Sequence, residues 1–387
     1  MKEKTSVDIL IIGGGTAATN AARAASTHGV EKIVLVHLPS LINTCVEEGC
    51  MPSKSILAGA ENQEDISEAE EIRNKHIKRL RRSLEDSFSE SGFSKIIGKA
   101  KFLSANEVSV ETEEDEVIYV ADKIIIATGS SPFVPPITGV DRNHPRILLS
   151  DDVVSKRAHF ASVPESVLVV GAGPVGLELA TFFFAMGSKI DVLQRESSLL
   201  PAMDPEFGTE RHLISQSEES FPIYLESELE AVELTDDAVS CKLKIGDESQ
   251  EGRYDYVLLA AGRRANVADL DPAKAGIELN DRGNIVHDST LRTSAPHIFV
   301  AGDVVGHHQI LHFAAKMGEV AGENAATDSK KIMDYDRYML AIAFEHYPSA
   351  LIGLTEAEAK KRELAVVTDT KHFNSIGLGI LKRQEYG

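Results

Sequence analysis

The chain is poor in cysteine and in basic residues, and it has no long apolar run. Its 387 residues contain 40 Lys and Arg against 60 Asp and Glu, a formal net charge of −20. Nucleic-acid backbones and anionic membranes attract an excess of Lys and Arg, so the composition argues against both partners. No stretch approaches the roughly 20 apolar residues that span a bilayer, and the N-terminus lacks an apolar signal segment with a cleavage site. We therefore expect a cytoplasmic protein without nucleic-acid or membrane partners.

Only three cysteines occur. Cys45 and Cys50 lie close together in the run TCVEEGCMPSK, whereas Cys241 is distant. Cytosolic thiols stay reduced unless a disulfide is catalytic, so the close pair indicates redox chemistry or metal binding rather than a structural disulfide. A zinc site normally needs three or four Cys or His ligands, and neither Cys241 nor a nearby histidine cluster supplies them. Redox chemistry is favoured.

Two segments repeat one pattern, in which an apolar strand leads into a glycine turn, a helix and a second strand. This context predicts two βαβ units. The expected strands are 8–12, 32–36, 166–170 and 189–193, and the helices end at about Thr27 and Met186. Further strands are expected at 108–110, 117–120, 256–260 and 297–300.

The two glycine turns match the sequence signature of dinucleotide binding. Glycine permits a tight turn and the close approach of a pyrophosphate, which then sits on helix N–H groups and the positive end of the helix dipole. Two copies predict two dinucleotides, and a glycine-rich connection without a ligand is the alternative for either turn. The positions are Gly13, Gly15 and Ala18 in the first turn and Gly171, Gly173 and Gly176 in the second.

Between the two units, apolar side chains recur every four residues beside a basic cluster. This spacing predicts a helix whose apolar stripe packs on the domain and whose basic face is solvated. The stripe consists of Ile72, His76, Leu80, Leu84 and Phe88, and the cluster of Lys78, Arg79, Arg81 and Arg82.

A disulfide between Cys45 and Cys50 requires a bend in the backbone. Disulfide Cα atoms lie about 4.4–6.8 Å apart, whereas five steps of a regular helix rise about 7.5 Å. Gly49 provides a flexible point, and Pro52 is suited to the start of a helix. The sequence therefore permits the bond.

Cys50 is the better candidate for a thiolate. A helix that begins near it offers unpaired N–H groups, and Lys54 lies one turn further on with a positive charge. Glu47 and Glu48 act in the opposite sense unless their side chains point to water, because a like charge raises a thiol pKa. The sequence leaves this conflict open.

The ordered motifs resemble those of the pyridine nucleotide-disulfide oxidoreductases, the family of dihydrolipoamide dehydrogenase, glutathione reductase and mercuric reductase. The resemblance covers nearly the whole chain. It rests on the first glycine turn and on TCVEEGCMPSK, ATGS, GAGPVGLELA, AAGRRAN, AGDVVG and GLTEAEA.

The resemblance implies an α/β fold with two three-layer, Rossmann-like dinucleotide-binding domains and an α+β interface domain. The expected domains are 1–155 (first part of the FAD domain), 156–280 (NAD(P) domain), 281–335 (second part of the FAD domain) and 336–387 (incomplete dimerisation domain). Family members continue beyond the point that matches Gly387, and that segment supplies a His-Glu pair to the partner subunit. The family dimerises through this domain, so a homodimer remains one alternative here.

The resemblance also implies a reaction. A hydride passes from NAD(P)H to FAD and an electron pair then passes to the Cys45–Cys50 disulfide. Cys50 would face the flavin, and Cys45 would exchange with a small-molecule or small-protein dithiol or disulfide. Lys54 and Glu178 match the ion pair near the reactive edge of the flavin, which tunes its electronics.

Cofactor-binding positions follow from the same motifs. They lie in the two glycine turns, at the ends of the second strands, directly before Cys45 and after the later strands. They are Gly13, Gly15, Ala18, His37, Thr44, Ala127, Thr128, Gly129, Gly171, Gly173, Gly176, Gln194, Arg195, Gly262, Gly302 and Asp303.

Several positions depart from the family pattern. His37 stands where an acidic residue normally accepts from the adenosine ribose, and a neutral imidazole can accept one hydrogen bond but lacks the charge. Ile42 and Asn43 replace two glycines, and their side chains would crowd a close approach to the flavin phosphates. Gln194 replaces the Glu of NAD-preferring relatives and is followed by Arg195, a combination that favours NADPH.

Two alternatives stay open. A pyridine nucleotide transhydrogenase or another flavin reductase would need hydride transfer to flavin but not the His-Glu pair of the family's C-terminal segment. A degenerate nucleotide-binding relative without turnover would explain His37, Ile42, Asn43 and the incomplete C-terminal domain.

Overall fold

A computed structural model shows two compact units. The first comprises Met1–Pro52, Lys75–Ser131 and Arg263–Tyr338, and the second comprises Ser53–Asn74, Pro132–Gly262 and Met339–Gly387. The structure describes residues 4–38, 43–63, 65–89, 92–155, 158, 160–200, 203–217, 220–307, 309–336, 340–345 and 347–382. In these ranges no helix has the length and apolar character that a membrane crossing requires.

The first unit is built on a sheet with the order β3-β2-β1-β6-β5-β4, and β17 also pairs with β6. Strands β3, β2, β1, β6 and β17 run parallel, whereas β5 and β4 are antiparallel additions. The strands are β1 (Lys4–Ile12), β2 (Ile33–His37), β3 (Ser94–Ile97), β4 (Lys99–Phe102), β5 (Glu107–Glu111), β6 (Glu116–Ile126) and β17 (Ile298–Val300). The central strands of this sheet, β1, β2, β6 and β17, carry apolar residues that are fully buried, such as Leu10, Leu35, Ile125 and Phe299, as parallel strands covered on both faces require.

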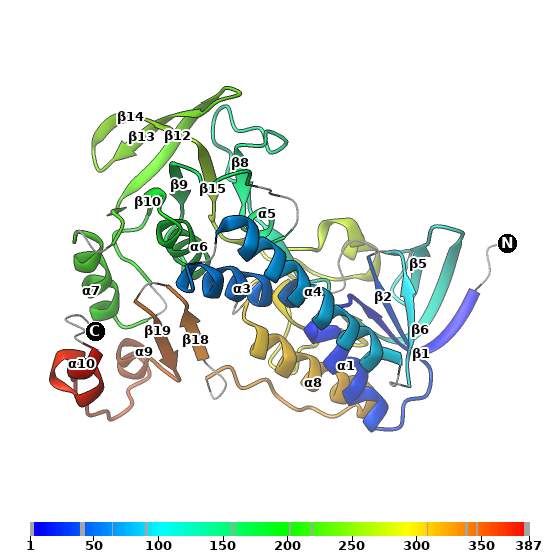
Figure 1. The fold of residues 1–387 in the computed structure, drawn as a ribbon. Coiled ribbons are helices and arrows are strands. Elements are labelled where there is room, and N and C mark those ends of the chain that lie inside the picture. The colour runs from blue at the N-terminus through cyan, green and yellow to red at the C-terminus, as the bar shows by residue number, and fades with distance from the viewer. Residues whose placement is uncertain are drawn as a thin grey trace. The chain divides into compact units, whose positions relative to one another are not determined.

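Helices α1 (Thr16–Thr27) and α8 (Leu311–Thr327) lie side by side in this unit (Figure 1). A Cβ atom on Gly318 or Gly322 of α8 would lie 2.2 Å from the Ala17 carbonyl oxygen or 2.3 Å from that of Ala21. Glycine at these positions therefore allows the backbones of the two helices to touch. The unit also contains α2 (Thr44–Glu47), the start of α3 (Cys50–Glu61) and most of α4 (Ile66–Ser89), and β16 (Arg263–Ala265) pairs with β7 (Ser130–Pro132).

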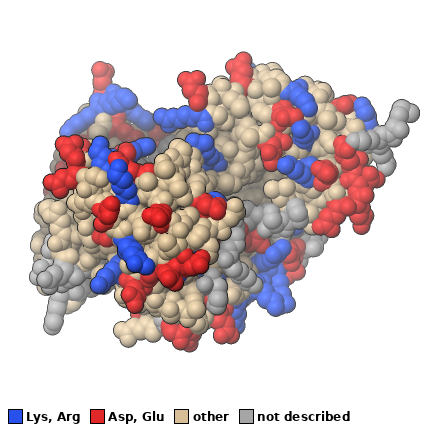
Figure 2. All heavy atoms as spheres, turned by 90° about the horizontal axis from the view of Figure 1, so that it is seen from above, with Lys and Arg blue, Asp and Glu red and all other residues tan. Residues whose placement is uncertain are grey.

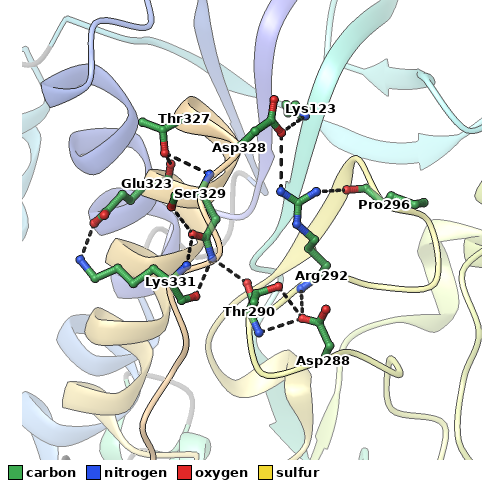
Figure 3. Close-up of polar contacts among 11 residues, drawn as sticks. Lys123, Asp288, Thr290, Arg292, Pro296, Glu323, Thr327, Asp328, Ser329 and Lys331 are labelled. Carbon is green, nitrogen blue, oxygen red and sulfur yellow. Dashed lines mark hydrogen bonds and ion pairs between the residues drawn. The ribbon is translucent and has the colours of Figure 1, made fainter.

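Asn324 joins the end of α8 to the chain on either side of it. Its buried side chain donates from Nδ2 to the carbonyls of Thr290 (2.9 Å) and Lys331 (2.8 Å). Its Oδ1 accepts from Ser329 Oγ at 2.6 Å and from the Lys331 backbone N–H at 3.0 Å. Figure 3 shows this network and the neighbouring ion pair between Lys123 and Asp328.

The second unit contains an all-parallel sheet with the order β11-β10-β9-β15-β8. The strands are β8 (Ile147–Leu149), β9 (Ser166–Val170), β10 (Lys189–Leu193), β11 (Ile223–Tyr224) and β15 (Tyr256–Leu259). Val167, Val169, Leu177 and Phe183 belong to one buried cluster, which ties the sheet to helix α6 (Pro174–Ala185).

Smaller elements complete this unit. Antiparallel strands form one three-stranded and one two-stranded sheet, and short helices connect the rest. They are β12 (Ser227–Leu234), β13 (Val239–Ile245), β14 (Glu248–Tyr254), β18 (Leu340–Ala343), β19 (Ser349–Ile352), α5 (Ser150–Val154), α7 (Pro205–Ser215), α9 (Glu356–Lys361) and α10 (Gly377–Lys382).

The predicted α/β class and the two Rossmann-like parallel sheets are confirmed, and both expected βαβ units are present. The helix expected from Ile72 to Phe88 is α4, but the expected stripe is wrong at His76, which is exposed. Arg73 is buried instead, because its guanidinium donates to the Val153 carbonyl at 3.2 Å. The Phe88 side chain lies outside the described part.

Basic and acidic side chains are interspersed on the face drawn in Figure 2. Acidic residues outnumber basic ones over the whole chain. Neither sign of charge dominates this face.

Replacing Asn324 by Ala should destabilise the first unit. Two carbonyls would lose the donor that the buried Asn324 supplies and a backbone N–H its acceptor, so we expect a loss of about 3 kcal/mol in the free energy of unfolding. Chemical denaturation followed by circular dichroism measures it. Asn143→Ala, at an exposed loop position, is the control, and equal midpoints for the two variants would contradict the role of Asn324.

Candidate functional site

The first glycine turn leaves a helix start open. Gly13 has φ +133, and a Cβ atom there would lie 2.0 Å from the Ala127 carbonyl oxygen. Gly15 is the N-cap of α1, without a side-chain cap and without an acidic residue in the first turn. A Cβ on Gly15 would meet nothing within 4 Å. The open space and the N–H groups fit a pyrophosphate, and Ala18 lies fully buried behind them.

The second turn repeats this geometry at the start of α6. Gly171 has φ +109, and Gly173 is an N-cap with no atoms within 4 Å of a Cβ position. A Cβ on Gly176 would lie 1.9 Å from the Gly171 carbonyl oxygen, so this position requires glycine for the contact between helix and turn. This turn also fits a dinucleotide.

His37 ends strand β2 with a side chain that is 3 % exposed. Its Nδ1 lies 2.7 Å from the Leu38 carbonyl oxygen, whereas Nε2 is buried and has no partner among the described residues. Burial lowers the pKa of His37, chiefly because the charged ring would lose its hydration, and the hydrogen bond to Leu38 acts in the opposite sense. A neutral ring with an unused acceptor results.

Ile42 lies outside the described residues. Asn43 is buried, and its side chain forms hydrogen bonds with other residues of the protein. Its Oδ1 accepts from the Val46 backbone N–H at 3.4 Å, and its Nδ2 donates to Thr16 Oγ1 at 3.3 Å. Asn43 therefore caps α2, whose first residue is Thr44, and ties it to the first turn of α1.

The backbone bends between the two thiols, as the sequence predicts. Cys45 lies in α2 and Cys50 begins α3, and both side chains are half-buried. A Cβ on Gly49 would lie 2.9 Å from the Thr44 carbonyl oxygen and 3.3 Å from the Cys45 Cα. Because this residue folds back onto the start of α2, the two cysteine segments are adjacent.

Glu47 has a positive partner. Its Oε1 lies 3.3 Å from Arg81 Nη1, and the Glu47 side chain is 11 % exposed. Arg81 belongs to the basic cluster expected to face solvent and is half-exposed, yet it also pairs with Glu85 at 3.2 Å. Arg81 therefore offsets one of the two carboxylates that we expect from the sequence to oppose thiolate formation at Cys50.

Lys54 and Glu178 form a close ion pair. Lys54 Nζ lies 2.7 Å from Oε1 and 2.9 Å from Oε2 of Glu178, whose side chain is 8 % exposed. The Lys54 ammonium also lies 4.4 Å from the centre of the Phe344 ring, a cation–π contact. Next to Phe344, the buried Glu345 pairs with the buried Arg211 of α7. The expected pairing of Lys54 with Glu178 is present in the second unit.

Asp303 belongs to a small polar network that follows two strands of the first sheet. Its Oδ2 accepts from Ser130 Oγ at 2.9 Å, and Arg263 donates to Ser130 Oγ at 2.8 Å and to the Ser130 carbonyl at 2.9 Å. Burial raises the pKa of Asp303, while Ser130 and the charge of Arg263 act to lower it.

The ATGS segment is held by Asn266. Thr128 Oγ1 donates to the Asn266 carbonyl at 2.6 Å, and Asn266 Nδ2 donates back to the Thr128 carbonyl at 3.0 Å. The Gly129 carbonyl accepts from the Asn266 N–H at 3.0 Å, and the Ala127 N–H donates to Ile12 at 2.7 Å. Sequence reasoning missed Ser130, Arg263 and Asn266 as site residues, although ATGS and AAGRRAN contain them.

The remaining predicted glycines lie at strand ends. Gly262 has φ +100 and its carbonyl accepts from the Phe133 N–H at 2.9 Å. Gly302 has φ +82, and a Cβ there would lie 2.8 Å from the Ala17 Cβ on α1. Gly302 thus allows α1 to pack against the segment between β17 and Asp303.

Gln194 is engaged with the second glycine turn. Its Oε1 accepts from the Ala172 N–H at 3.0 Å, and its Nε2 donates to Glu196 Oε2 at 2.9 Å. The Arg195 side chain is 75 % exposed and reaches Glu196 Oε1 at 3.1 Å. A cation and a carboxylate therefore adjoin at the end of β10, where a ribose substituent would be recognised.

Cys241 is separate from this chemistry. It lies on β13 with 2 % exposure, and burial raises the pKa of its thiol to about 12. Among the described residues, no group of three or more His, Cys, Asp or Glu side chains could hold a metal ion.

Each unit brings together part of the predicted set. The first holds the Gly13 turn, His37, both thiols, Thr128 and Asp303. The second holds the Gly171 turn, Gln194, Lys54 and Glu178. Helix α3 begins with Cys50 in the first unit and carries Lys54 in the second.

Comparison with known proteins agrees with this geometry. The profile of the pyridine nucleotide-disulphide oxidoreductases matches residues 7–318. Dihydrolipoyl dehydrogenase of Vibrio cholerae is 30% identical over 378 residues, which cover 93% of this chain and 78% of that protein. Mercuric reductase of Streptomyces lividans is 29% identical over 408 residues, which cover 100% of this chain and 84% of that protein.

A solved structure is also similar. The Cu(II) complex of the HOCl-induced flavoprotein disulfide reductase RclA from Escherichia coli matches with a TM-score of 0.87 and 25% identity. The match covers 99% of this chain and 85% of that one. Two glycine turns on parallel sheets, the paired thiols and these matches lead to one conclusion: the chain belongs to the pyridine nucleotide-disulphide oxidoreductases, a family of flavin-dependent enzymes.

Proposed function

We propose that this protein is an FAD-dependent NAD(P)H:disulfide oxidoreductase with Cys45 and Cys50 as its redox pair. The observation that carries the proposal is the folding of Gly49 onto Cys45, directly before Cys50 begins a helix. The balanced reaction is NAD(P)H + H⁺ + disulfide → NAD(P)⁺ + two thiols, and each cysteine sulfur gains one electron when the S–S bond breaks.

Residues of the first unit fit FAD. The open space at Gly15 and the N–H groups of α1 would hold the pyrophosphate, and Asp303 would accept from the ribityl chain. FAD, when bound, supplies a two-electron acceptor for the nicotinamide hydride and a donor to the disulfide. We further propose 1–155 and 281–335 as the FAD domain, 156–280 as the NAD(P) domain and 336–387 as part of the dimerisation domain.

The thiols would have different roles. Cys50 begins α3, where unpaired N–H groups stabilise a thiolate, so Cys50 would face the flavin and Cys45 would exchange with substrate. The Lys54 ammonium, held by Glu178, would keep a fixed positive charge near the reactive edge of the flavin.

The relatives support a proposal for the substrate class. Family members act on disulfide substrates and are typically homodimers, and one relative is a dihydrolipoyl dehydrogenase. We propose a small-molecule or small-protein dithiol or disulfide as substrate, a homodimer as the assembly, and the cytoplasm as the location. Lipoamide is the first compound to test.

Replacing Cys45 by Ser should abolish NADPH oxidation with lipoamide and spare electron transfer to a quinone or dye, because only the exchange thiol is lost. Steady-state assays with both acceptors measure this, and Cys241→Ser, at a buried unreactive thiol, should change neither. Turnover of lipoamide by the Cys45 variant would sink the proposal. If the wild-type protein reduces dyes but not lipoamide, the result would support a transhydrogenase or another flavin reductase. If it binds NADPH without turning over any acceptor, the result would support a degenerate relative.

Lys54→Met and Glu178→Gln should each slow flavin reduction by NADPH roughly 100-fold, since either change removes a fixed charge or its anchor. Anaerobic stopped-flow absorbance measures the rate. The control is Lys75→Met, at an exposed position of α4. Rates equal to that of the control would show that the pair has no electrostatic role.

Arg195→Ala should lower kcat/KM for NADPH roughly 10-fold and leave that for NADH nearly unchanged, because only NADPH has a 2′-phosphate that the exposed guanidinium could contact. Glu196→Gln should shift preference further toward NADPH by removing a carboxylate. Arg253→Ala on β14 is the matched control. An equal effect of Arg195→Ala on both nucleotides would refute the NADPH preference.

A further inference from the structure

His37 lies beside the first glycine turn. The Gly13 N–H donates to the Val36 carbonyl at 2.7 Å, so the residue after Val36 ends its strand next to the turn that opens α1. In dinucleotide-binding βαβ units, the side chain about 20 residues after the glycines receives a ribose hydroxyl. His37 occupies that position with a ring that is 3 % exposed.

The hydrogen bond at Nδ1 determines the tautomer. The Leu38 carbonyl oxygen, 2.7 Å away, can only accept, so Nδ1 carries the proton. In a neutral ring Nε2 then has a lone pair and is an acceptor. It is buried and has no partner among the described residues, although a buried polar atom is stable only when it is hydrogen-bonded.

We propose that the neutral His37 ring, oriented by Leu38, accepts a hydrogen bond at Nε2 from a hydroxyl of the adenosine ribose of FAD. It replaces the carboxylate that usually fills this position. The inference rests on the proposed function in taking FAD as the cofactor of the first unit. It adds that FAD retention depends on the protonation state of this ring.

The charged neighbours of the ring come from three elements. Lys95 of β3 and Arg81 of α4 disfavour the protonated ring, and Glu47 of α2 favours it. Burial is the largest effect and keeps the pKa of His37 below its ordinary value of about 6.5. Protonation would turn Nε2 into a donor, so FAD affinity is full at neutral pH and falls as pH falls through this lowered pKa.

The ligand side provides the sharpest test. The dissociation constants of FAD and of analogues without the 2′- or the 3′-hydroxyl of the adenosine ribose are measured on the apoprotein by flavin fluorescence. Wild type should bind one analogue roughly 2- to 10-fold more weakly than FAD, the effect of one neutral hydrogen bond. Equal affinities in wild type would overturn the inference without any variant.

Variants extend the test. His37→Leu should bind FAD and the analogues equally, and continued discrimination would overturn the inference. His37→Gln keeps an acceptor that does not titrate, so its FAD affinity should stay constant as the pH is lowered from neutral, whereas that of wild type should fall once the pH passes below the lowered pKa of His37. Equal pH profiles would also overturn it.

His28 provides the matched control. This exposed histidine also bonds a backbone carbonyl through Nδ1, at 2.8 Å from the Ala24 oxygen, so His28→Gln should follow wild type in every measurement. An apoprotein that binds no FAD at all would defeat the proposed function as well. FAD binding without discrimination would defeat only the role of His37.

Discussion

Both dinucleotide-binding turns depend on a close contact between two backbone segments, which only a glycine permits. Cβ atoms on Gly13 and Gly171 would lie 2.0 Å and 2.5 Å from the carbonyl oxygens of Ala127 and Ala260, each just after a neighbouring strand. Only glycine allows the turn to close here, and its positive φ directs the chain into a helix. Each sheet thereby presents open helix N–H groups, and residues at the end of the next strand, His37 and Gln194, lie beside them.

The segment from Thr44 to Cys50 also depends on a glycine that lies close to a neighbouring backbone. Gly49 lies against the backbone of Thr44 and Cys45, so a short capped helix and the start of α3 meet at the thiols. Helix α3 then carries Lys54, whose charge is held by Glu178 and covered by the Phe344 ring. Backbone geometry thus determines where the sulfurs lie, and within the first unit the long-range pair of Arg81 with Glu47 adds a positive charge beside α2.

Local patterns predicted much of this from the sequence. Strand–turn–helix spacing gave both parallel sheets, and Gly49 indicated the bend between the cysteines. What could not be predicted depends on residues far apart in the chain: Arg81 with Glu47, Asp303 with Ser130 and Arg263, and Arg211 with Glu345. The four-residue periodicity wrongly predicted that His76 is buried. Arg73 is buried in its place, and its guanidinium donates to the Val153 carbonyl, a partner that only the tertiary fold provides.

The central claim is that Cys45 and Cys50 form a redox pair that exchanges electrons with a bound flavin. An anaerobic titration of the purified yellow protein with NADPH, followed by absorbance, tests it most directly. We expect the first equivalent to produce a long-wavelength thiolate-to-flavin band while the flavin stays oxidised, because the electron pair comes to rest on the two sulfurs. Bleaching of the flavin by that first equivalent without such a band, or a colourless protein that cannot be reconstituted with FAD, would contradict it.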